Sequence, residues 1–281
     1  DIAEEGHLDH LIRSAIGAGA PMGAVYRTAS WSAAQGFGLR DRGLIAPGYR
    51  ADMVLLDDLA DCAVASVIRD GRPVDDESFG GHRPDLSVGR RSIKLDRVEP
   101  SIFEVPGIGP SGPVIGLVPD GVITTHLTMD LPFANGLRHP DPENDVLKVV
   151  VLNRHGGYRN IGRGFIKGFG FRDAAIASSV GHDAHNVIVV GDNDRDMAVA
   201  VNRLIEIEGG FAVVRGGRVI ADLPLPIAGL MSDKSAADVV IALQRLRLAA
   251  KDIGCPLPEP FLHIAFLPLC VIPHLKITDH G

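Results

Sequence analysis

Residues 174–205 read AAIASSVGHDAHNVIVVGDNDRDMAVAVNRLI. This stretch holds two short apolar runs, Ala174–Ser178 and Val187–Val190, whose length and content are typical of buried strands. Beyond them, apolar side chains recur three and four residues apart, the spacing of one helix face: Met197, Ala198, Val201, Leu204 and Ile205. Two buried strands followed by an amphipathic helix predict a domain of mixed α and β structure.

The sequence on both sides of this stretch continues the pattern. Further strands are expected at Leu147–Leu152, Phe211–Val214 and Arg218–Ala221, the last two joined by a turn at Gly216–Gly217. A second helix is expected from about Ser235 to Ile253, and Gly254 can end it in the left-handed conformation. The glycines between positions 162 and 170 predict tight turns between strands. These elements predict an α+β domain over residues 121–281.

The first 42 residues predict two short helices. Glu4 and Glu5 precede apolar residues at helical spacing, and acidic side chains favour a helix start. Gly19 interrupts this helix, and Pro21 can open the next one because proline tolerates the first helical turn.

Residues 43–80 predict a small β ribbon. An apolar run at Met53–Leu56 and its partner at Val64–Ile68 read as paired strands, and Asp70-Gly71 reads as a hairpin turn. The following residues, 81–120, are rich in glycine, proline and charge, so a linker or irregular connection is expected there.

Composition excludes several classes of protein. Of the 281 residues, 28 are basic and 35 acidic, so a formal charge of −7 without a basic block argues against nucleic acid or a membrane as partner. The three cysteines, Cys62, Cys255 and Cys270, are too few and too far apart for a disulfide framework or a zinc knuckle. With no apolar segment of about 20 residues and no signal-peptide layout, a cytoplasmic protein is expected.

Several motifs resemble one family. The segment GLIAPGYRADMVLLD, residues 43–57, is similar to the stretch by which many amidohydrolases leave their metal-binding barrel for a small β-sandwich. Five further motifs, in order, resemble the C-terminal domain of bacterial adenine deaminases: RHG at 154–156, KGFG at 167–170, SSVGHDAHNVIVVG at 178–191, DMAVAVNRL at 196–204 and LPLPIAGLMSD at 223–233. The chain therefore resembles the C-terminal portion of an adenine deaminase of the amidohydrolase superfamily.

This resemblance implies a fold. Residues 1–42 would supply the last helices of a (β/α)8 barrel, and residues 43–80 would supply strands of the β-sandwich. After the connection at 81–120, residues 121–281 would form the family's C-terminal α+β domain. The fold class is accordingly mixed α/β and β.

The resemblance also implies an activity, the hydrolysis of adenine to hypoxanthine and ammonia in purine salvage, and it implies a homo-oligomeric enzyme. In the family a divalent metal, manganese or iron, turns water into the attacking hydroxide. Its ligands include a His-x-His pair, which this sequence lacks, so the main ligands are expected upstream of Asp1 and no metal ligand is assigned here. The isolated chain is expected to be inactive.

Six residues are candidates for a site. His182, Asp183 and His185 are catalytic or site-supporting candidates. At a strand entry His182 and Asp183 would point to opposite faces, whereas in a turn both histidines could converge on a substrate or a metal. Alternatively, they belong to a hydrogen-bonded turn that fixes domain packing. Candidates for substrate binding are Asn186 in the same cluster and Arg154 and His155 after a strand end; a surface loop held by ion pairs of Arg154 is the other interpretation.

Other functions stay open. The C-terminal domain could be an assembly or support module, with the apolar segment Phe261–Ile272 in an interface. The parent enzyme could act on another amino-purine or a cyclic amide. Residues Gly191–Asp196 resemble a magnesium-binding loop of phosphatases, but an upstream nucleophilic Asp-x-Asp element is missing, and helix capping accounts for these acidic groups.

Overall fold

The computed structural model describes residues 2, 4–79, 85–119, 121–156 and 160–281. Its contacts divide the chain into two units, unit 1 (residues 1–84) and unit 2 (residues 85–281). Each unit is described by itself.

Unit 1 combines short helices with a three-stranded antiparallel sheet. Helix α1 (Leu8–Gly17) precedes an almost continuous helical segment, made of α2 (Met22–Arg27), a π-helical turn (Thr28–Ser32) and α3 (Ala33–Gly36). Strands β1 (Met53–Asp58), β2 (Ala63–Arg69) and β3 (Arg72–Pro73) follow, and then a 3-10 turn (Asp76–Phe79). The two predicted helices and the predicted strand pair are confirmed, the second helix running further than expected.

The hairpin turn of unit 1 shows why its sequence folds locally. Asp70 and Gly71 both have positive φ, at 50° and 78°, as a two-residue hairpin turn requires. The carboxylate of Asp52 accepts the backbone N–H of Asp70 at 2.8 Å, and Arg50 forms ion pairs with both acids. Asp52 therefore fixes the turn.

Unit 2 is built around an eight-stranded sheet with the order β14-β13-β11-β12-β9-β10-β5-β6. All neighbours are antiparallel except β10 and β5. The strands of the sheet are β5 (Ser111–Leu117), β6 (Thr124–Asp130), β9 (Val146–Leu152), β10 (Ile161–Lys167), β11 (Ala174–Ser178), β12 (Val187–Gly191), β13 (Gly210–Arg215) and β14 (Arg218–Pro224). Three very short strands form a separate sheet: β4 (Val105–Pro106), β7 (Phe133–Ala134) and β8 (Leu137–Arg138).

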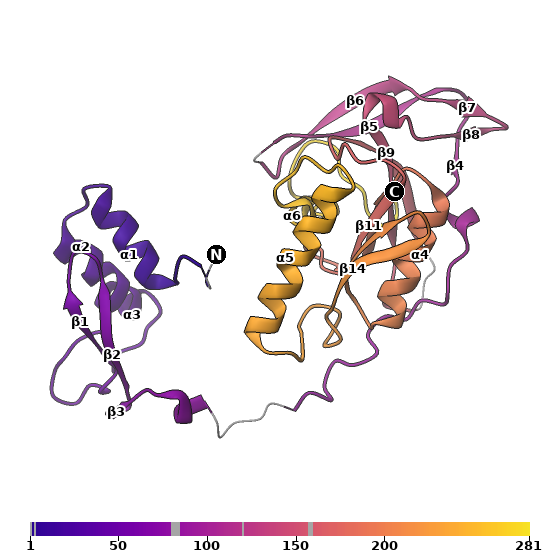
Figure 1. Cartoon of the computed structure of the whole chain (residues 1–281). Helices are drawn as coiled ribbons and strands as arrows, with labels where there is room; N and C mark the ends of the chain where they lie inside the picture. Colours follow the sequence, from indigo (N-terminus) through magenta and orange to yellow (C-terminus); the bar gives the residue numbers. More distant parts are fainter. Residues whose placement is uncertain (1, 3, 80–84, 120, 157–159) are drawn as a thin grey trace. The chain divides into compact units, whose positions relative to one another are not determined.

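Helices cover both faces of the large sheet (Figure 1). Helix α4 (Asp194–Glu206) packs on one face, and α5 (Ala236–Asp252) and α6 (Pro260–Phe266) pack on the other. Alternate residues of β9 enter the two cores, because side chains of a strand point to opposite faces. Val149 and Val151 join the core under α5 and α6, whereas Val150 and Leu152 join the core under α4. The predicted mixed α and β structure is confirmed.

Two predictions fail for particular residues. The irregular connection expected over 81–120 contains β5, an internal strand of the large sheet. Gly112, Pro113 and Gly116 hid this strand, because glycine and proline are depleted in strands. The glycines from 162 were expected in turns, yet Gly162 and Gly164 lie within β10. Each marks a close approach of other chain atoms, which is a common reason for glycine in a strand.

Candidate functional site

The candidate residues meet because of strand register. In the antiparallel pairing of β9 with β12, Leu152 lies opposite Val187. The residues that follow β9 therefore lie beside those that precede β12. This register brings Arg154 and His155 together with the loop Ser179–Asn186, which we name the histidine loop. The two sets of candidates, which were predicted separately, thus lie next to each other in the fold.

Arg154 lies inside the protein, only 2% exposed. Its guanidinium donates to Ser92 Oγ at 2.9 Å, to the Ala228 carbonyl at 2.8 Å and to the His185 carbonyl. Among the described residues no carboxylate pairs with it, and burial lowers the pKa of its guanidinium. The ion-paired surface loop considered from the sequence is wrong, since Arg154 ties three chain segments together through neutral acceptors.

Asn186 is also buried, 3% exposed, and its Oδ1 accepts the backbone N–H of Arg154 at 3.4 Å. His155, by contrast, is exposed at the surface. The Nε2 of its ring lies 2.6 Å from the Ala184 carbonyl, which can only accept, so Nε2 carries the proton. His155 thereby binds the tip of the histidine loop.

The histidine loop turns sharply. Asp183 and His185 have positive φ, at 69° and 48°, a conformation that Asp and His tolerate better than most residues. The backbone N–H of His182 donates to the Ala265 carbonyl at 2.8 Å, and its ring stacks on Phe266 of α6 with centroids 3.8 Å apart. Asp183 is exposed to solvent. The loop is therefore a turn, one of the two geometries that the sequence left open, and α6 supports one side of it.

His185 has an unusual environment. Its Nδ1 is buried and has no hydrogen-bond partner among the residues that the structure describes. Burial lowers the pKa of His185, and the positive charges of Arg154, His182 and His155 lower it further. His185 is accordingly a neutral imidazole at neutral pH.

The charges of this site do not suit a metal. Arg154 lies beside the histidine loop, and its buried guanidinium repels a cation. Throughout the part of the chain that the structure describes, no three His, Cys, Asp or Glu residues come close enough to share a metal ion. The residues present do not fit the divalent metal that the sequence resemblance implies.

In the acidic segment Gly191–Asp196, the three aspartates and Asn193 all make structural contacts. Asp192 accepts the backbone N–H groups of Asp173 and Ala174, and Asn193 caps α4. Asp194 pairs with the buried Lys148, and Asp196 accepts from Gly216 and Gly217 at the β13–β14 turn. The helix cap is thus the amide of Asn193, and the three aspartates, which were expected to cap the helix, hold neighbouring strands and a turn instead.

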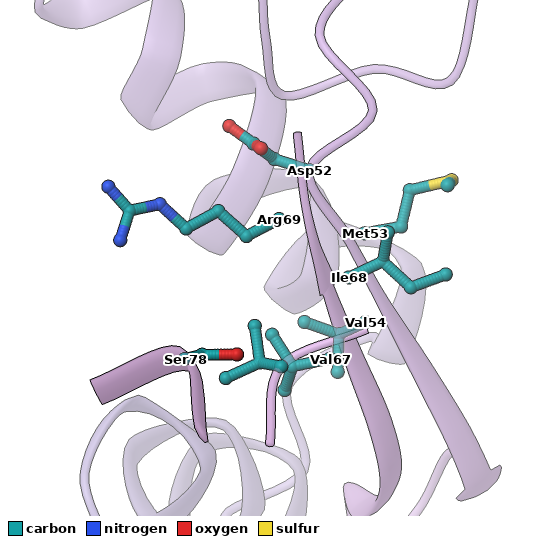
Figure 2. Close-up of a pocket in the computed structure, with 8 residues that line it drawn as sticks. Asp52, Met53, Val54, Val67, Ile68, Arg69 and Ser78 are labelled. Atoms are coloured by element: carbon teal, nitrogen blue, oxygen red, sulfur yellow. The ribbon is translucent and has the colours of Figure 1, made fainter. Parts of the chain in front are cut away.

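A separate groove lies on the hairpin of unit 1 (Figure 2). Its volume is about 400 Å³, and it is lined by Asp52, Met53, Val54, Val67, Ile68, Arg69, Val74 and Ser78. Figure 2 shows Val54 and Val67 next to each other, with the Arg69 guanidinium directed away from them. Because Asp52 is already engaged in the turn, the groove offers apolar surface rather than reactive groups.

Sequence reasoning found the cluster but missed its supports. Ser92 and Ala228 hold Arg154, and Asp279 holds Asn153 next to it, yet each lies more than 60 positions from its partner in the chain. Nothing in their local sequence signals these contacts.

Comparison with known proteins places the chain. The family model for the adenine deaminase C-terminal domain matches residues 121–281. Across its whole length the chain is 59% identical to an adenine deaminase of Methylobacterium nodulans, 56% to one of Gluconobacter oxydans and 52% to one of Brucella suis. It covers 50%, 50% and 48% of these relatives, respectively, and so spans about half the length of the curated relatives it matches. Within the described residues, no helix is both long and apolar enough to pass through a membrane.

Proposed function

The chain belongs to the adenine deaminase family, and from this membership we propose that the polypeptide of which it forms part hydrolyses adenine to hypoxanthine and ammonia. The resemblance predicted from the motifs is confirmed. The observation that carries the proposal is identity of 59% to an adenine deaminase over the whole of this chain, unit 1 included.

The catalytic metal belongs, in this proposal, to the other half of the parent polypeptide. When bound, a divalent metal such as manganese or iron supplies hydroxide at neutral pH. The described residues of this chain hold no suitable ligand group, and the histidine loop lies beside a buried positive charge. We therefore route no chemical step through these residues.

For unit 1 we propose the role that the resemblance implies. Its helices would be the last helices of the barrel, and β1 to β3 would be strands of the β-sandwich. The support is physical: large apolar side chains stand exposed on both parts, including Leu11 at 61%, Val54 at 56% and Leu55 at 48%. Such faces are stable in water when another surface covers them.

For the histidine loop we propose a role in supporting the active site of the parent enzyme. His155 and Asp183 are exposed, where a second protein surface or a substrate can reach them, and the half-buried His182 stacks on Phe266 and holds the loop. Arg154 and Asn186 would act from inside, since both are buried and bonded to the chain. Direct substrate contact is thus assigned to the exposed members alone.

The test is ammonia release from adenine with added manganese or iron. The full-length parent is expected to turn over adenine, and the 281-residue chain is expected to release none. In the parent, replacing His182 and His185 by alanine should lower turnover about tenfold or more, because small displacements at a site are costly. His126→Ala, on the exposed surface of β6, is the matched control. Sustained turnover by the chain alone would refute the proposal that the other half of the parent polypeptide holds the catalytic metal.

A second candidate is an assembly role for unit 2. The segment first proposed for an interface, Phe261–Ile272, is largely internal: Ile264 and Leu267 are 0% and 1% exposed. Exposed apolar residues remain on α5 and α6, namely Ile241, Leu248 and Leu262. We propose that these contribute to a homo-oligomer of the parent. Sedimentation of a parent carrying Ile241→Ser and Leu248→Ser should show dissociation, while the histidine variants should sediment as the wild type does.

A further inference from the structure

The last residues of the chain pack tightly on unit 2. Ile277 is 4% exposed and joins the core under α5 and α6. Its N–H donates to the Leu267 carbonyl at 3.2 Å. The Thr278 carbonyl then lies directly over Gly162 of β10, where an added Cβ would come within 1.7 Å of the carbonyl oxygen. The terminal segment, Ile277–Gly281, therefore packs against β10 at Gly162, where a side chain would not fit.

A path of hydrogen bonds leads from the terminal segment to the histidine loop. Asn153 Nδ2 donates to Asp279 Oδ2 at 3.0 Å, and Asn153 Oδ1 accepts the backbone N–H of His155 at 3.0 Å. His155 Nε2 in turn donates to the Ala184 carbonyl at 2.6 Å. Asp279, 8% exposed, thus stands at one end of the path, and the loop stands at the other.

The donor and acceptor groups of the Asn153 amide allow this path in only one orientation of the amide. An amide offers donors on one side and an acceptor on the other, whereas a carboxylate only accepts. Because Asp279 requires the NH2 side of Asn153, the oxygen side is left to face the N–H of His155. Removing the carboxylate frees the amide to turn, and a turned amide would present its donors to another donor.

We propose that Asp279 is a positioning residue for His155 and, through His155, for the histidine loop at Ala184. The terminal segment seated on Gly162 places the Asp279 carboxylate, and the carboxylate sets the orientation of the Asn153 amide. Loop placement thus depends on a residue 95 positions away from Ala184 in the chain.

The test compares two different disturbances of the segment in the 281-residue chain. Asp279→Ala removes the acceptor, while Gly162→Ala displaces the segment without touching Asp279 or His155. Both should speed hydrogen exchange of the His155 backbone N–H about fivefold to tenfold, the effect of one lost hydrogen bond. Both should also shift the His155 imidazole ¹⁵N resonances away from the Nε2–H tautomer. Asp279→Asn, which keeps an acceptor oxygen of similar size, should restore both signals.

Two matched controls separate positioning from general damage. His280→Ala removes the exposed neighbour of Asp279; the His280 ring contacts Asn160 and Asp279. Gly109→Ala adds a methyl group in unit 2 at a position where the new Cβ meets no described atom within 4 Å outside the adjoining residues. Neither should alter the His155 signals. Unchanged His155 exchange and tautomer in folded Asp279→Ala and Gly162→Ala chains would overturn the proposal, and so would failure of Asp279→Asn to rescue.

Activity of the full-length parent supplies an independent readout, and this arm alone rests on the proposed function. Asp279→Ala is expected to lower kcat/KM and Asp279→Asn to recover it. A shifted His155 signal with unchanged kcat/KM would support the positioning role and refute the proposed role of the histidine loop in the active site. An unchanged His155 signal refutes the positioning role whatever the activity.

Discussion

Unit 1 and unit 2 differ in how completely they bury their own apolar side chains. Of the residues that the structure describes in unit 1, only Ile12, Ala34 and Cys62 are buried hydrophobic residues. All the remaining buried hydrophobic residues among those described lie in unit 2. In unit 2 the central strands β9, β11 and β12 are covered on both faces by helices. Helical and strand periodicity alone therefore do not show whether a segment carries its own core.

The largest expected effect separates the units as fragments. Residues 85–281 produced alone should unfold cooperatively in urea, because the two cores of the sheet are internal to unit 2. Residues 1–84 alone should show no cooperative transition, since their apolar faces have no cover. Circular dichroism during urea titration measures both. A sharp transition in the 1–84 fragment would show that unit 1 needs no partner surface.

A matched pair of leucines sharpens the same comparison. Leu147 in β9 is fully buried, whereas Leu55 in β1 is 48% exposed. Leu147→Ala should lower the free energy of unfolding by about 2–5 kcal/mol, the usual result for a buried leucine. Leu55→Ala should change it by less than about 0.5 kcal/mol. Equal losses in urea denaturation of the whole chain would mean that Leu55 is covered in solution.

The sequence predicted some of these elements because their patterns are local. The run LKVVVL at 147–152 and the stripe behind Met197 each fit one element type, and both are found. Strands β5 and β10 were missed because their glycines, and Pro113 in β5, are residue types depleted in strands. Gly162 makes room for the Thr278 carbonyl, a contact across more than 100 positions that no local pattern encodes.

The site was predictable to a similar extent. Polar residues at the ends of two apolar runs marked Arg154 and the histidine loop, and the strand register does bring them together. Burial of Arg154 could not be foreseen, because its acceptors, a hydroxyl and two carbonyls, come from segments far away in sequence. Every residue has a backbone carbonyl, so the amino-acid sequence does not show which carbonyls will accept a hydrogen bond from Arg154.

Two aspartates that accept backbone N–H groups of a turn, one in each unit, extend the comparison of the units to polar side chains. Asp196 in unit 2 is 2% exposed and accepts the N–H groups of Gly216 and Gly217 at 3.0 and 2.6 Å. Asp58 in unit 1 accepts those of Ala60 and Asp61 at 2.7 and 2.8 Å, but in an exposed turn. Asp196→Ala should cost roughly 1–3 kcal/mol, since it leaves buried donors unpaired.

Asp58→Ala should cost less, about 0.5–1 kcal/mol, because water replaces the carboxylate. Urea unfolding followed by tryptophan fluorescence for unit 1 and by circular dichroism for the whole chain measures the two losses, Trp31 being the one tryptophan of the sequence. A larger loss for Asp58→Ala would contradict the view that unit 2 alone is closed to solvent.

The smallest expected effect is a pH dependence that belongs to unit 2. Burial, then the charge of Arg154, lowers the pKa of His185 in the folded chain, while the unfolded chain keeps the ordinary value of about 6.5. Just below that pH the unfolded state binds a proton that the folded state does not, so the stability of unit 2 falls as the solution is acidified from about pH 6.5.

His185→Gln removes this proton uptake and should flatten the slope of the urea midpoint between pH 7.5 and 5.5. His10→Gln removes a histidine of unit 1 instead and should leave the unit 2 midpoint unchanged at every pH. Parallel pH profiles for the wild type and His185→Gln would mean that His185 is as free to accept a proton in the fold as in the unfolded chain, and the loop would then be open to water rather than closed over Arg154.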